Sequence, residues 1–124
     1  MTRLHSGHVL DFKEGPKVLL WGDKAAVGQL VELLRQRQSA SLTPYVDAVD
    51  GKPISILLDA TSPGMHRAET GLEWRLSSET MSLFADLLGP LVAPGGPGHQ
   101  YLSCGKDGIE VMVSVGEYPQ DLRP

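Results

Sequence analysis

The sequence has little cysteine and no long apolar run, and each shortage excludes a class of protein. Cys104 is the single cysteine among 124 residues, so an internal disulfide and a zinc site of several cysteines are excluded. No apolar run approaches the roughly 18 residues that a membrane-spanning helix needs. The first residues also lack the apolar segment of a signal peptide. We therefore expect a cytoplasmic protein without membrane contact.

An excess of positive charge is also absent. Eleven basic and fifteen acidic residues give a formal net charge of -4, which argues against a nucleic-acid partner because such proteins normally carry a basic face. Hydrophobic residues make up 41% and charged residues 21%, as in an ordinary globular protein. The length predicts one domain that spans residues 1–124.

Hydrophobic periodicity predicts six strands and two helices. The expected strands are residues 8–12, 17–21, 54–60, 69–77, 99–103 and 109–117, and the expected helices are 24–38 and 77–91. Asp23 is a good N-cap for the first helix, Ser77 or Ser78 for the second, and Gly89-Pro90 is a natural stop. The order is ββα-ββα-ββ. It predicts an α+β two-layer sandwich, with two helices on one face of a largely antiparallel six-stranded sheet.

The two strand-strand-helix segments resemble each other. Residues 18–34 align without gaps with residues 72–88, so that the strand, the capping residue and a terminal Leu-Leu pair fall in register. One interpretation is an internal ββα repeat over about 8–38 and 54–91, followed by a terminal hairpin at 99–117. The other is that helices with good cores look alike, and the sequence leaves both open.

The motifs that suggest chemistry are weak. Cys104 begins a predicted turn rather than a helix and has the opposite parity to His99 on the strand, which is poor geometry for a nucleophile–base pair. Gly105-Lys106 is followed by Asp107 and a strand, so the phosphate-loop pattern is absent. The four histidines are scattered, and nothing brings two carboxylates together in a cleft. We therefore expect no enzymatic activity, no metal and no cofactor.

The surface is more informative. Apolar and polar residues alternate along the predicted strands, and both helices would cover the apolar face of the sheet, so the opposite face would have no helix on it. That face would carry a mixture of aromatic, methionine and charged side chains, which suits a binding surface. Its members would be Leu19, Trp21, Ser55, Leu57, Asp59, Glu73, Arg75, His99, Tyr101, Glu110 and Met112. The alternative, that loops and the N-terminal segment cover this face, stays open.

The C-terminal quarter resembles the ending of small bacterial immunity proteins of polymorphic toxin systems. The resemblance is carried by His99, Tyr101, Leu102, Val113, Ser114, Glu117 and Tyr118. Members usually have Asp where this chain has Ser103. The resemblance implies a compact cytoplasmic α+β protein without catalysis, which binds and blocks one toxin domain.

We thus expect a non-enzymatic binding protein whose partner is a toxin domain. The residues expected to contact the partner are Trp21, Glu73, Arg75, His99, Tyr101, Glu110 and Tyr118. Two alternatives remain open. One is a structural module that forms a homodimer, and the other is a small-ligand-binding domain with a pocket beside the loops 39–52 and 92–98.

Overall fold

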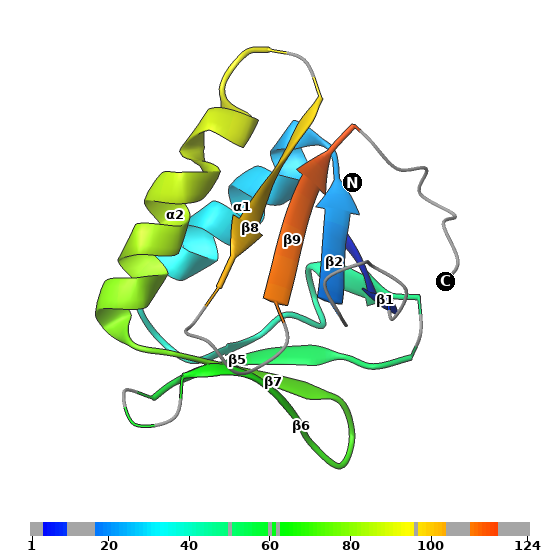
Figure 1. The fold of residues 1–124 in the computed structure, drawn as a ribbon, viewed down its shortest axis with the longest axis vertical. Coiled ribbons are helices and arrows are strands. Elements are labelled where there is room, and N and C mark those ends of the chain that lie inside the picture. Colours follow the sequence, from blue (N-terminus) through cyan, green and yellow to red (C-terminus); the bar gives the residue numbers. More distant parts are fainter. Residues whose placement is uncertain are drawn as a thin grey trace.

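The structure is a computed structural model that describes residues 4–9, 17–49, 51–59, 61, 63–95, 97–103 and 110–116. Several of the residues discussed above lie outside these ranges, namely Cys104, Gly105, Lys106, Asp107, Glu117 and Tyr118. The fold is α+β, with nine strands and two helices in the described part (Figure 1).

The strands form two sheets. The five-stranded sheet has the order β4-β1-β2-β9-β8 and consists of β4 (Val46–Ala48), β1 (Leu4–Val9), β2 (Lys17–Gly22), β9 (Glu110–Val115) and β8 (Gly98–Leu102). The four-stranded sheet has the order β3-β5-β7-β6 and consists of β3 (Ala40–Ser41), β5 (Ile54–Leu58), β7 (Leu72–Leu76) and β6 (Gly64–Arg67). In Figure 1 the four-stranded sheet forms the lower end of the molecule.

The expectation of one largely antiparallel sheet is wrong. The β1–β2 and β8–β9 hairpins are antiparallel as predicted, but β2 pairs in parallel with β9, β5 with β7, and β1 with β4. The reason is a short strand between the predicted strands 54–60 and 69–77, which the sequence did not predict. Residues 64–67 form β6, which pairs antiparallel with β7, so that β5 reaches β7 from the other side as a parallel neighbour.

The helices begin where the sequence predicts and end elsewhere. Asp23 caps α1 (Lys24–Arg35) by accepting a hydrogen bond from the Ala26 N–H at 2.9 Å, and Ser77 caps α2 (Ser78–Val92) through the Thr80 N–H at 3.1 Å. α1 stops three residues before the predicted end at Gln38, and Arg37 has a φ of 54°.

α2 continues through the Gly89-Pro90 pair and ends at Val92, one residue beyond the predicted end at 91. Pro90 has no N–H and so removes one helical hydrogen bond, and it lies in the last turn of the helix, with only two helical residues after it. The carbonyls at this end find other donors. The ammonium group of Lys24 donates to the Leu91 oxygen at 3.1 Å and to the Ala93 oxygen at 2.6 Å, and it thereby ties the start of α1 to the end of α2.

The main core lies between the paired helices and the inner faces of both sheets. The alternating residues predicted to face inward are buried there, among them Leu20 and Val113 of the five-stranded sheet and Trp74 of the four-stranded sheet. Trp74 packs against Phe84 of α2 with ring centroids 5.8 Å apart. α2 buries an apolar stripe at helical spacing that consists of Met81, Phe84, Ala85 and Leu88.

Apart from β4, the pairing pattern of the first half of the structure, which contains β1, β2, α1, β3 and β5, corresponds to that of the second half, which contains β6, β7, α2, β8 and β9. The order β1-β2-β9-β8 in one sheet matches β6-β7-β5-β3 in the other, with the same parallel and antiparallel relations. Each half gives its last strands to the hairpin of the other half, and α1 and α2 follow equivalent strands, β2 and β7. Common ancestry of the halves stays a prediction.

Candidate functional site

The residues expected to contact a partner do not share one surface. Glu73 and Arg75 lie on β7 of the four-stranded sheet, whereas His99, Tyr101 and Glu110 lie on β8 and β9 of the five-stranded sheet. Tyr118 is outside the described residues. The sequence placed all of these residues on one face because it predicted one sheet, and the division into two sheets separates them.

Trp21 was expected on the exposed, helix-free face, but the structure shows that it is buried. It is 2% exposed and packs in a second apolar cluster with Leu19, Met112 and the partly buried Val49. Its ring lies 5.5 Å from that of His5. The centre of the five-stranded sheet is thus apolar on both faces, and the prediction of an accessible helix-free face is wrong at β2 and β9.

The four-stranded sheet does present an accessible face. We call the side directed away from the core the outer face. It presents the side chains of Ser41, Ser55, Leu57, His66, Glu73 and Arg75. Ser41, Ser55, Glu73 and His66 form one row across all four strands, and Leu57 and Arg75 lie in a second row across β5 and β7. These side chains are half-buried or exposed. In Figure 1 both helices and the five-stranded sheet lie on the other side of this sheet.

An ion pair lies at the middle of the outer face. The Arg75 guanidinium donates to Oε1 of Glu73 from Nη2 at 2.9 Å and from Nε at 3.3 Å. Both side chains are 32% exposed, so the pair is partly desolvated yet reachable from solvent. An exposed pair of this kind stabilises the fold by at most about 1 kcal/mol. Its donors and acceptors fit an incoming surface with charges of both signs.

The edge strand β8 carries the second group of expected residues. Tyr101 is 39% exposed, and its ring meets that of His99 edge-on with centroids 5.5 Å apart. Beside them, the Ser103 hydroxyl donates to the Glu110 carboxylate at 2.6 Å. Sequence reasoning missed this contact, although the two residues flank the turn of the predicted hairpin. An Asp at position 103 would instead place two like charges together.

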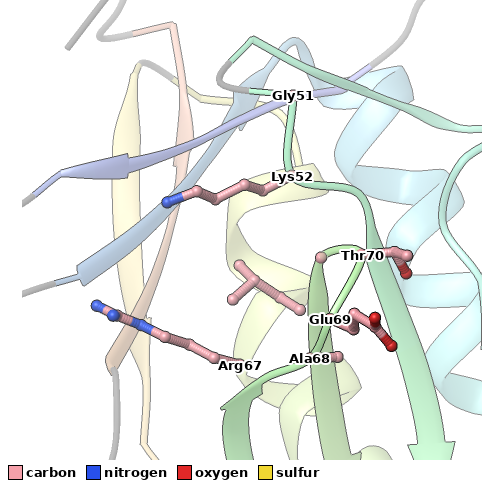
Figure 2. Close-up of a pocket in the computed structure, with 8 residues that line it drawn as sticks. Gly51, Lys52, Arg67, Ala68, Glu69 and Thr70 are labelled. Atoms are coloured by element: carbon pink, nitrogen blue, oxygen red, sulfur yellow. The ribbon is translucent and has the colours of Figure 1, made fainter.

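A pocket of about 240 Å³ lies where the β6–β7 turn meets the segment before β5. Lys52 and Arg67 extend toward one side of it, and Glu69 and Thr70 point to the other (Figure 2). Gly71 packs tightly against Pro53, whose carbonyl accepts the Leu72 N–H at 2.8 Å. The lining residues thus include two cationic side chains, Lys52 and Arg67, and one acidic side chain, Glu69.

The carboxylates considered for acid–base chemistry make separate contacts. Asp59 accepts hydrogen bonds from the N–H and hydroxyl of Thr61 at 2.8 and 2.7 Å, while Glu73 binds Arg75 and Glu110 accepts from Ser103. Within the described ranges, no three histidine, cysteine, aspartate or glutamate side chains gather as metal ligands would.

Neither helix in the described part of the chain is long and apolar enough to cross a membrane. Of the residues expected to contact a partner, Glu73 and Arg75 on the outer face are each 32% exposed, and Tyr101 on β8 is 39% exposed. Comparison with protein-family models, characterised proteins and solved structures gives no significant match to this chain.

Proposed function

We propose that this chain is a non-enzymatic binding domain whose protein partner docks on the outer face of the four-stranded sheet. The observation that carries the proposal is the accessibility of this face, which presents Glu73, Arg75 and Leu57 together. A charged pair beside an apolar side chain suits a protein interface, in which charges determine specificity and apolar groups exclude water.

The partner that we propose is a toxin domain, as the resemblance of the C-terminal hairpin to immunity proteins implies. The net charge of -4 favours encounter with a basic surface. On docking, a basic group of the partner would approach Glu73 and an acidic group would approach Arg75. His99 and Tyr101 lie on the other sheet and fall outside this proposed contact.

The test exchanges the charges of the ion pair and leaves the net charge unaltered. The variant Glu73→Arg/Arg75→Glu keeps one acid and one base two residues apart on β7, so the fold and the overall electrostatic attraction are preserved. The matched control is Leu83→Gln, which also leaves the net charge unaltered, because Leu83 is a 54% exposed side chain on α2, away from the outer face.

Each protein is used as bait in a pull-down from the native organism, and the affinity of the recovered partner is then measured by calorimetry. We expect one stoichiometric partner with toxin activity that this chain neutralises. We expect it to bind the exchanged variant at least about 10-fold more weakly, with unchanged binding to the control. Equal binding to the exchanged variant would exclude the outer face. Recovery of a second copy of this chain alone would favour the homodimer.

A further inference from the structure

A second pocket lies between the two sheets, on the side of the molecule where β4 meets β1. It measures about 220 Å³. Its floor is formed by the buried residues Ser6, Leu42 and Ile54, and it opens to solvent past Thr43, Asp47 and Pro53, which are exposed. This pocket is separate from the outer face and from the pocket at the β6–β7 turn.

Ser6 is the unusual residue of this floor. It is 1% exposed, and its Oγ has no hydrogen-bond partner among the described residues. A buried hydroxyl without a partner is costly, and in native proteins such a group commonly meets a bound water, ion or ligand. Here the unpaired hydroxyl belongs to a residue that lines a pocket.

The correspondence between the two halves explains how the space arises. Ser6 pairs with Leu20 of β2, and the residue equivalent to Ser6 in the other half is Met65, which pairs with Trp74 of β7. Met65 is 4% exposed and belongs to the main core. One half therefore fills this position with a long apolar side chain, and the other half has a small polar residue beside a pocket.

We propose that this pocket binds a small uncharged organic molecule with an apolar body and one polar group that hydrogen-bonds to Ser6 Oγ. The apolar floor favours a hydrocarbon body, and Ser6 provides a single buried point of polar recognition. Asp47 at the rim opposes an anion. The size is sufficient, because an engineered apolar cavity of about 150 Å³ binds benzene.

The test uses phenol as the probe, with toluene as its analogue of the same shape without the hydroxyl and benzoate as its charged counterpart. Each is titrated into the full chain, and binding is followed through backbone amide chemical shifts in NMR spectra. Two variants are compared with the natural chain. Ser6→Ala removes only the hydroxyl, and Ser6→Met introduces the side chain that the other half has at this position.

In the natural chain we expect phenol to produce saturable shifts at Leu42 and Ile54. Toluene should bind about 3- to 10-fold more weakly, as the loss of one hydrogen bond implies, and benzoate should not bind. Ser6→Ala should make phenol and toluene equal, and Ser6→Met should abolish binding of both.

Three results would overturn the proposal. They are the absence of saturable shifts with phenol in the natural chain, an unaltered preference for phenol in Ser6→Ala, and unaltered phenol binding in Ser6→Met. Should Ser6→Met fail to fold, Ser6→Ala alone decides the matter. The measurement does not involve the protein partner, so its failure would leave the proposed function untouched.

Discussion

Replacing Trp21 with alanine distinguishes a structural role from a binding role for this residue. The side chain is 2% exposed and lies in the cluster with Leu19 and Met112, and a Cβ atom on Gly7 would lie 3.6 Å from Cζ3 of its ring. The substitution removes a large aromatic group from a closely packed site. Its main effect should therefore be on the free energy of unfolding.

The expected loss follows from the burial. Truncating a buried Trp or Phe to Ala costs about 3–5 kcal/mol, against a total of about 5–15 kcal/mol for a typical domain. With a urea m-value of about 2 kcal/mol/M, a loss of 4 kcal/mol lowers the unfolding midpoint by about 2 M. Trp21→Ala should thus remain partly folded and unfold at a much lower urea concentration.

The matched control is Tyr101→Ala, which removes an aromatic side chain from the same side of the same sheet. Tyr101 is 39% exposed, so its loss should cost about 1 kcal/mol or less. Both variants are unfolded in urea and followed by circular dichroism. A loss below about 1 kcal/mol for Trp21→Ala would refute the reasoning and return Trp21 to the candidate binding residues.

Two further predictions concern glycines. Gly71→Ala would bring a Cβ atom into the Pro53 carbonyl oxygen, closer than real Cβ atoms approach other atoms. The β6–β7 turn must then shift, and urea unfolding should show a loss of about 1–3 kcal/mol; an unchanged midpoint would contradict this packing. Gly28→Ala lies inside α1, where the new Cβ would only touch Val92 Cγ1 at 3.7 Å. Thermal unfolding should show a gain of up to about 1 kcal/mol from helix propensity, and a clear loss would mean that α1 and α2 pack more tightly at this point.

The candidate site was predictable from the sequence only in part. The alternation of residues 72–76 correctly places Glu73 and Arg75 opposite the buried side of their strand. The same reasoning wrongly predicts that Trp21 is exposed. Alternation along a strand indicates which residues share a face of the sheet, but not whether other parts of the chain cover that face. Ser6 gave no signal at all, because the predicted first strand covers residues 8–12, whereas β1 covers Leu4–Val9, so Ser6 lay outside every predicted element.

The sequence by itself determined the starts of the two helices and the buried faces of the longer strands, but it did not predict the short strands β3, β4 and β6. Asp23 and Ser77 begin the two helices, and the alternating apolar residues of β5, β7 and β9 face the core, because caps and periodicity act between residues close in the chain. Only the tertiary structure decided that two sheets form, that β9 joins β2, and that Ser6 lines a pocket. These outcomes depend on which distant segments pack together, and the pattern within a single segment contains no information about its partner.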